Sequence, residues 1–333
     1  MAVLAQEFPT LADVVKATDA KGQMLTPFVE PLMKRLALLN VLPLVECNDG
    51  TGHVFGSRIA RPSLGWRKIN QGIDPSKSRR AQIRETTGIL EGRSEIDVDL
   101  VQINGNTASF RLDEEKGFID EMAEEVSTGM FYHSVATSPE KFHGLTDRFD
   151  DETDDQVIDA ETADATGGEN ASIWLLGFSK DTVFGIYPEG TPGGLERYDH
   201  GRIPVEDRDG KKFDAWVTNW KWKIGLCVKD ERYVVRICNI ERDELAADRT
   251  SGANLADLMT QAVDLLWSTD GVQPAFFMDR TLLTMLRRQT LNDQRGNYLG
   301  WEKIPGLPGV TPNWAGIPIL RDDALAVDED EVT

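Results

Sequence analysis

The sequence has few of the residues and motifs on which enzymes, metalloproteins and membrane proteins depend. It contains three cysteines, Cys47, Cys227 and Cys238, and no CxxC pair, which is typical of reduced packing residues in a cytosolic protein. It has four histidines and lacks the GxSxG, P-loop, GxGxxG and HExxH motifs. No run approaches the roughly 18 apolar residues of a membrane span. The N-terminal residues, which include Glu7 and Asp13, do not resemble a signal peptide. We therefore expect no enzymatic activity, no cofactor, no metal and no membrane contact.

Basic residues are outnumbered by acidic ones overall but exceed them in one stretch. The 333 residues include 36 Lys and Arg against 56 Asp and Glu, which gives a net charge of −20. Residues 56–93 reverse this balance with nine basic and three acidic residues, whereas residues 147–164 contain nine acidic residues and one arginine. The acidic total argues against a nucleic-acid reader, whose domain is normally basic. The separation of charge predicts instead that copies of this chain attract one another.

Hydrophobic periodicity predicts short helices at 10–18 and 26–40 and one long helix at about 107–132. The long helix has an apolar stripe with a four-residue spacing, formed by Phe118, Met122, Val126 and Met130. Residues 56–93 lack a helical period and are punctuated by Gly and Pro, which is typical of the two limbs of a long hairpin. Such a hairpin is marginal unless it rests on a partner. Residues 94–103 alternate in hydrophobicity and predict a half-buried strand, with a short helix as the alternative.

The region 172–240 is rich in predicted strands. The runs SIWLLGF and TVFGIY are two of them. Residues 220–228 alternate apolar and polar side chains, which predicts a half-buried strand. We expect residues 232–240, RYVVRICNI, to form its antiparallel mate across the turn KDER. The tryptophans of this region are interpreted as core residues.

Helices and strands alternate toward the C-terminus. Asn254 and Asp279 are each predicted to cap a helix, because Asn and Asp side chains accept hydrogen bonds from the first turn. The runs QPAFFM and GIPILRD are predicted strands. Residues 323–333 are predicted to form an acidic tail.

Three possible sites have weak support from the sequence. Asp199 and His200 are an acid–base pair that an acidic cytosolic hydrolase could use, although neighbours in a loop seldom orient each other. His133 and His143 flank a loop near Asp147, which allows a metal site. The acidic run 150–155 allows a calcium-dependent binding module, but it lacks the glycine and the terminal glutamate of an EF-hand loop.

Three runs of residues resemble a known family: LGWRKINQGIDPSKSRRAQ, FRLDEEKGFIDEMAEE with MFYHSVATSPEKFHGL, and SIWLLGFSKDTVFGIYPEGTPGGLE. They resemble the major capsid proteins of tailed bacteriophages, in the group whose long helix follows a loop containing Trp-Arg-Lys. The resemblance implies an α+β protein with a Hong Kong 97-like coat fold and no enzymatic activity. An encapsulin-like compartment shell, which stores a cargo enzyme, is the alternative within the same fold.

The resemblance also implies a domain organisation. Residues 1–55 would form an N-terminal arm, and 56–93 an extension loop. Residues 94–253 would form a peripheral domain that includes the long spine helix and the strands of 172–240. Residues 254–322 would form an axial domain, and 323–333 the acidic tail.

The implied partners are other copies of the chain, arranged as hexamers and pentamers of an icosahedral shell around double-stranded DNA. A separate scaffolding protein and a portal are expected, a decoration protein is possible, and assembly would take place in the host cytoplasm before the shell becomes the virion capsid. We expect the basic hairpin to lie over an acidic surface of the next copy, with Trp66 as an apolar anchor. The candidate hairpin residues are Arg58, Arg61, Trp66, Arg67, Lys68, Arg79 and Arg80. The candidate acceptors are the long helix and Asp150, Asp151, Glu152, Asp154 and Asp155.

Overall fold

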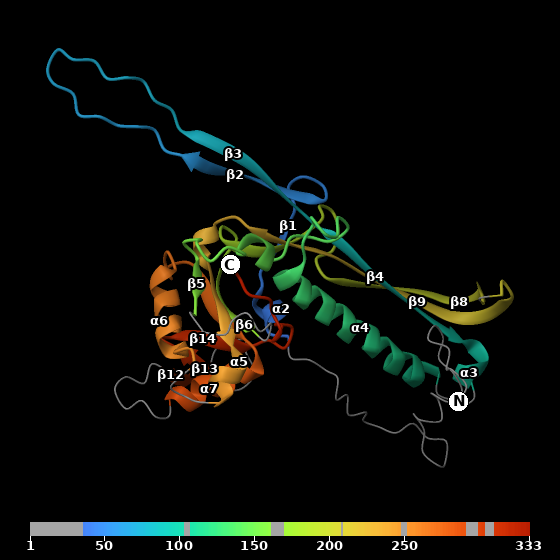
Figure 1. Ribbon diagram of the computed structural model, residues 1–333. Coiled ribbons are helices and arrows are strands. Elements are labelled where there is room, and N and C mark those ends of the chain that lie inside the picture. The colour runs from blue at the N-terminus through green and yellow to red at the C-terminus, as the bar shows by residue number, and fades with distance from the viewer. Residues whose placement is uncertain are drawn as a thin grey trace.

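The computed structural model describes residues 36–102, 107–160, 170–207, 209–247, 252–290, 299–303 and 310–333. Figure 1 shows a compact part that contains the C-terminal helices, an elongated part built around one long helix, and a hairpin that projects away from both. The helix predicted at 10–18 lies outside the described residues. Of the helix predicted at 26–40, the structure describes only the end, where α2 (Leu38–Val41) forms one turn. No helix in the described ranges is long and apolar enough to cross a membrane.

The elongated part is a helix lying along three paired strands. α4 (Thr107–Tyr132) coincides with the helix predicted from its apolar stripe. Met122, Val126 and Met130 of that stripe are buried where α4 follows β4 (Gly88–Asp97) and β9 (Lys212–Val228) in Figure 1. β9 is paired with β4 on one edge and with β8 (Leu195–Glu206) on the other, both antiparallel. The stripe therefore attaches the helix to the sheet.

The strand predicted at 94–103 is only partly correct. β4 ends at Asp97, and α3 (Val98–Gln102) follows it. The Asp97 carboxylate accepts a hydrogen bond from the Asp99 backbone N–H at 2.8 Å, as a residue at the start of a helix commonly does. Ile96 at the end of β4 and Val98 at the start of α3 are both buried. The alternation of apolar residues therefore extends from the strand into the helix, which is why it predicted a longer strand.

The compact part is built on the most deeply buried strand, β6 (Asn170–Phe178). In the described part of the chain, twelve strands form one continuous sheet, whose main path runs β12-β13-β14-β11-β6-β7-β9-β4. The bounds of the strands not yet given are β1 (Leu44–Glu46), β5 (Val157–Asp159), β7 (Val183–Tyr187), β10 (Val234–Glu241), β11 (Gln273–Met278), β12 (Leu299–Glu302), β13 (Thr311–Trp314) and β14 (Ile317–Arg321). Because β9 belongs to both parts, one sheet links them.

The predicted pairing of 220–228 with 232–240 is wrong. β10 instead pairs antiparallel with β6 and parallel with β5. The edges of β9 are already occupied, since β7 pairs with Gly225–Val228 and β4 and β8 pair with the rest. The intervening turn contains a 3-10 helix, Glu231–Tyr233, capped by Asp230, and it redirects the chain. A run such as VVRICNI suits a strand that is buried on both faces.

The two helix caps are confirmed. The Asn254 side chain accepts from the Asp257 backbone N–H at the start of α6 (Leu255–Leu265). Asp279 accepts from the Thr281 N–H at 2.6 Å at the start of α7 (Arg280–Thr290). α5 (Arg242–Ala247) completes the helices of the compact part. The apolar sides of α6 and α7 pack into a large hydrophobic core, which contains Leu255 and Leu258 of α6 and Leu282, Leu283 and Leu286 of α7.

The C-terminal residues, which the sequence predicts as an acidic tail, pack against the protein in part, although Asp328, Asp330 and Glu331 are exposed. Leu325 and Val332 are buried. Glu329 is also buried, and its carboxylate accepts hydrogen bonds from Arg236 at 2.8 Å and from the Tyr132 hydroxyl at 2.6 Å. An acidic residue can be buried where it pairs with a buried cation, and Arg236 inside the sheet provides that cation for Glu329.

The buried cysteines lead to the first prediction. Burial raises the pKa of Cys47 to about 11 and the pKa values of Cys227 and Cys238 to about 12. The reactive thiolate is therefore rare near pH 8, and iodoacetamide should alkylate the native protein at least about a hundredfold more slowly than the denatured protein. Mass spectrometry of timed samples measures this ratio. Equal rates in the two states would show that these thiols are accessible.

Candidate interaction surface

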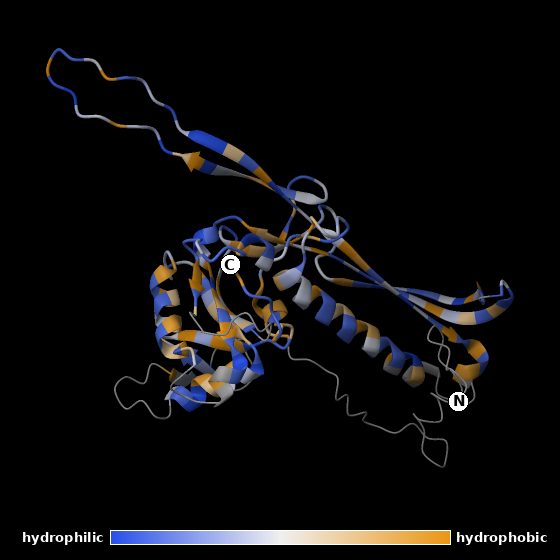
Figure 2. Cartoon of the chain, in the orientation of Figure 1, coloured by the Kyte–Doolittle hydropathy of each residue, from blue (hydrophilic) through white to orange (hydrophobic). Residues whose placement is uncertain are grey.

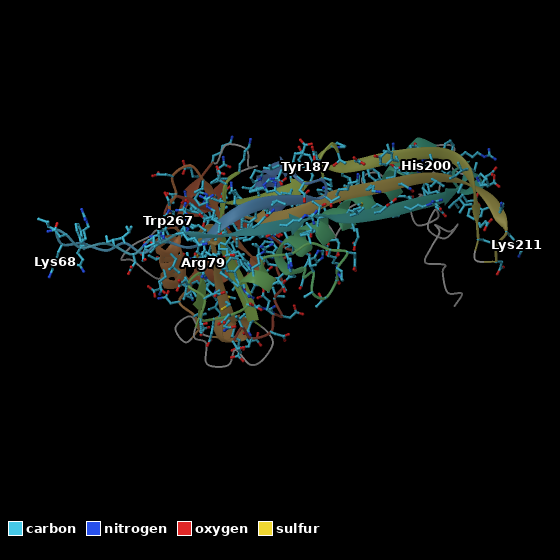
Figure 3. All side chains as sticks on the ribbon, turned by 90° about the horizontal axis from the view of Figure 1, so that it is seen from above. Lys68, Arg79, Tyr187, His200, Lys211 and Trp267 are labelled. Carbon is cyan, nitrogen blue, oxygen red and sulfur yellow. The ribbon has the colours of Figure 1, made fainter. Side chains whose placement is uncertain are left out.

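The hairpin is formed by β2 (Gly52–Ala60) and β3 (Arg79–Thr86), which pair antiparallel from Gly52↔Thr86 to Ala60↔Arg79. Residues 61–78 continue beyond the paired strands without regular structure, and 61–77 are all exposed. Figure 1 shows this segment running far from the rest of the molecule. Figure 3 shows Lys68 at its outer end and Arg79 closer to the body. We call residues 61–78 the tip.

The tip exposes large apolar side chains that the protein does not cover. Trp66 is fully exposed, Leu64 is 94% exposed and Ile69 is 92% exposed. Figure 2 shows hydrophobic positions scattered among hydrophilic ones along this segment. Exposed apolar residues are normal when single, but several in a short projecting segment indicate a surface for a partner.

The basic residues predicted for the interface lie along the same hairpin. Arg58, Arg61, Arg67, Lys68, Arg79 and Arg80 are all exposed. No ion pair within the described residues includes any of these six. Arg67 makes a long hydrogen bond, 3.4 Å, to the backbone oxygen of Gln71. Their positive charge is thus available to another molecule.

The acidic tract 150–155 is exposed between the 3-10 helix η1 (Thr146–Arg148) and β5. Asp151 accepts hydrogen bonds from the backbone N–H and the hydroxyl of Thr153, and these bonds lower its pKa. None of the ion pairs among the described residues joins this tract to the hairpin of the same copy. The predicted pairing of the two charged segments within an assembly stays a prediction.

A buried ion pair that sequence reasoning missed holds the root of the hairpin. Glu85 of β3 accepts two hydrogen bonds from Arg148 of η1, both at 2.7 Å, and its side chain is 5% exposed. Gly225 of β9 lies beside this point, and a Cβ there would be 2.5 Å from the backbone oxygen of Thr86. Both features fix the direction in which the hairpin leaves the body. The sequence does contain a signal for this pair, because Arg148 is the one basic residue of the acidic segment 147–164.

A second ion pair, of which the carboxylate is buried and the guanidinium is partly exposed, joins α4 to the long sheet. Glu115 accepts two hydrogen bonds from Arg197 of β8, at 2.9 and 3.1 Å, and one from the Thr218 hydroxyl of β9 at 2.9 Å. Arg111 lies near Glu115, at 3.7 Å, and donates to Asp199 at 2.8 Å. These contacts hold the N-terminal part of α4 against the strands.

The structure does not assemble the alternative sites. Asp199 accepts from Arg111 and from the Gly201 backbone N–H, and these partners, rather than His200, occupy its carboxylate. His143 lies 2.7 Å from Asp147, whereas His133 lies 3.3 Å from Glu125, so the two histidines belong to different pairs. Among the described residues, no three His, Cys, Asp or Glu side chains are placed to hold a metal ion.

Comparison with known proteins identifies the family. A model of the family described as Major capsid protein GP7 matches residues 19–333. The chain belongs to this family. A solved structure of bacteriophage Epsilon15 is 27% identical, with a TM-score of 0.79, and the match covers 100% of this chain and 99% of that chain. The bacteriophage JBD30 capsid matches 95% of this chain and 99% of that chain at 13% identity, with a TM-score of 0.50, which supports the fold alone. Comparison with curated proteins gives no match.

The chain is therefore a major capsid protein of a tailed phage with the Hong Kong 97-like coat fold, as the resemblance implied. It is a structural protein of the virion capsid, which self-assembles into the shell, and it is not an enzyme. This finding excludes the hydrolase and favours a phage coat over the compartment shell that the sequence left open.

The buried pair at the hairpin root leads to the second prediction. Replacing Glu85→Gln leaves the Arg148 guanidinium buried beside a neutral amide. We expect the free energy of unfolding of the capsid protein to fall by about 3–5 kcal/mol. Urea unfolding followed by circular dichroism measures the change.

The matched control is Glu91→Gln on β4, the next strand along the chain. Glu91 pairs with Lys221 at 3.5 Å, and its side chain is about half exposed. Its loss should change the free energy of unfolding by no more than about 1 kcal/mol. Equal effects of the two substitutions would contradict the structural role of the Glu85–Arg148 pair.

Proposed function

We propose that this capsid protein assembles as hexamers and pentamers of an icosahedral shell that encloses double-stranded DNA. The observation that carries this proposal is the exposed apolar and cationic tip, for which the same copy provides no partner among its described residues. A surface on one copy that fits a different surface on the next is a heterologous contact, and such contacts form a ring when the rotation between copies closes. Hexamers and pentamers are rings of this kind.

The proposed contact places the basic hairpin of one copy over acidic residues of the next. The donors are Arg58, Arg61, Arg67, Lys68, Arg79 and Arg80, with Trp66 as an apolar anchor. The acceptors are α4, whose sequence contains seven carboxylates and two cations, and Asp150, Asp151, Glu152, Asp154 and Asp155. A single exposed ion pair contributes only about 0–1 kcal/mol, so the number of pairs matters more than any one pair.

The acidic balance of the chain suits a container for DNA. With a net charge of −20, the shell has little tendency to bind phosphate groups without sequence preference. DNA packed inside is then held by the closed wall, and its release requires no strong contacts to break. We further propose, as partners, a separate scaffolding protein, a portal and a possible decoration protein, with assembly in the host cytoplasm. The domain organisation of arm, extension loop, peripheral domain and axial domain is part of the same proposal.

Charge reversal on the hairpin tests the proposed contact. The triple substitution Arg67→Glu, Arg79→Glu and Arg80→Glu replaces attraction to the acidic neighbour by repulsion, and like charges at an interface oppose association. We expect a folded protein that fails to form shells when observed by electron microscopy and size-exclusion chromatography.

The control carries the same change in net charge at other exposed positions, Lys180→Glu, Lys211→Glu and Lys212→Glu. This variant should keep assembling, because its substitutions lie outside the hairpin. Shells of normal size and yield from the Arg67, Arg79 and Arg80 variant would refute the proposed contact.

The content of the shell tests the second part of the proposal. Particles isolated from infected cells should contain DNA that survives nuclease treatment of the intact particle and is digested after the particle is opened. Particles that contain a protein cargo and no DNA would instead indicate a storage compartment.

A further inference from the structure

A small apolar pocket lies where the C-terminal end of α4 meets the beginning of β4. Its volume is about 170 Å³. Ile89 and Leu90 of β4, Val126 of α4, Phe142 and Ile224 form most of its wall. Ile89 is 59% exposed, although it is a large apolar residue at the start of a well-paired strand. The pocket is thus open to solvent and has no apolar cover in the described part of the chain.

His133 contributes an uncharged ring to the wall of the pocket. The ring of His133 packs edge-on against Phe142, with 5.3 Å between the ring centroids. Burial, followed by the nearby Lys141 ammonium, lowers the pKa of His133, and Glu125 on its other side opposes this shift only in part. The ring is therefore uncharged at neutral pH. Lys141 is itself paired with Glu125 at 3.0 Å, so its charge is compensated.

The rim of the pocket carries charges of both signs, because Glu125, Glu140 and Lys141 line it and Lys223 is the partner of Ile89 in the β4–β9 pair. Lys141 is paired with Glu125, which leaves Glu140 and the nearby Glu121 to receive a cation. Glu140 lines it and is exposed. Glu121 lies one helical turn before Glu125 on α4 and is also exposed. Neither forms an ion pair with another described residue. An apolar hollow with acidic neighbours favours a ligand that has an apolar anchor next to positive charge.

The tip has that pattern. Trp66 is fully exposed, and the two cations Arg67 and Lys68 follow it directly. An indole ring buries a large area in a single pocket, which is why tryptophan is frequent among the residues that dominate binding. Leu64 and Ile69 flank it and can cover the exposed face of Ile89.

The tip of the same copy cannot occupy this pocket. The pocket includes Gly88, two residues after β3, and so lies at the root of the hairpin. Figure 1 shows the hairpin running from this root away from α4. The occupant must therefore be the tip of another copy. Because the contact joins the tip of one chain to the hairpin root of the next, it repeats in one direction and can close a ring.

We propose that this pocket binds Trp66 of a neighbouring copy, with Arg67 and Lys68 of that copy beside Glu140 and Glu121. The inference rests on the proposed function, and it adds the specific site that receives the hairpin. It makes α4 and β4 the main acceptor, and the tract 150–155 lies outside it. Two observations support this proposal: the charges of the tip and of the pocket rim are complementary, and both the tip and the pocket expose apolar side chains.

Chemical crosslinking tests the contact directly. A chain with Trp66→Cys and Ile89→Cys is co-expressed with an equal amount of wild-type chain, so that wild-type contacts help to maintain the shells and about half of the neighbours of each substituted copy are also substituted. A short bis-maleimide is added to the purified shells, whose native cysteines are buried. We expect crosslinked dimers on a denaturing gel, because the two positions lie together in adjacent copies. The control chain with Trp66→Cys and Trp267→Cys, the second also an exposed tryptophan, should give none.

Assembled shells without dimers, or with equal amounts of dimer in both chains, would overturn the assignment. A double-mutant cycle gives an independent measurement on the folded protein. Trp66→Ala should raise the concentration needed for assembly about tenfold or more. Adding Ile89→Ala should have little further effect, because residues in contact are not additive. Independent effects that multiply, or normal assembly of Trp66→Ala, would refute the pocket as the seat of Trp66.

The two levels of the proposal fail in different ways. If the charge-reversed hairpin blocks assembly but Trp66→Ala does not, the hairpin contacts a neighbour at another place and only the pocket is wrong. If both variants assemble normally, the hairpin is not an assembly contact and the proposed hairpin contact is wrong as well, whereas shell formation itself is tested by the particles and their DNA content.

Discussion

The structure depends on one constraint: the chain carries apolar side chains on a hairpin that has no core of its own. A two-stranded hairpin in water is marginal, because each of its faces is open to solvent. Here the paired strands end at Ala60 and Arg79, and the tip beyond them exposes Leu64, Trp66 and Ile69 almost completely. The free energy that such side chains gain on burial can be obtained only in contact with another molecule. Such a hairpin therefore indicates that the protein binds a partner, even in the structure of a single chain.

That constraint requires a rigid base, and arginine–glutamate pairs with buried carboxylates provide it. Glu85 with Arg148 holds the hairpin root, Glu115 with Arg197 holds α4 to the sheet, and Glu329 with Arg236 holds the C-terminal residues. In each pair the guanidinium donates two hydrogen bonds or shares the carboxylate with hydroxyl groups, which offsets the cost of removing charge from water. An acidic chain has few cations, and it places several of them where they join elements that are distant in the sequence.

Much of the local structure follows from residue patterns, but strand pairing does not. The stripe of Met122, Val126 and Met130 defined α4, and Asn254 and Asp279 marked two helix starts, because these signals act within a few residues. The partner of β10 could not be derived from the sequence, since pairing depends on which edges other strands have already taken. Lack of helical period in 56–93 indicated a hairpin, and its charge indicated a partner. The pocket beside Ile89 was beyond prediction, because residues from α4, β4, β9 and a loop form it together.

The separation of charge also bears on how strong each contact should be. In the proposed ring every copy would present one tip and one acceptor, so that each copy would be held twice and a closed shell would multiply the effect. Individual contacts can then be weak, and a misplaced copy can leave before the ring closes around it. Exposed ion pairs suit this requirement, since each contributes little and salt weakens them further. In the proposed contact a buried apolar anchor would supply direction, because the indole would occupy one hollow while the surrounding charges tolerate small shifts. In this proposal many weak ion pairs supply the affinity, and one apolar anchor sets the register of the contact. The tip combines the anchor and two of the cations in three consecutive residues, Trp66, Arg67 and Lys68.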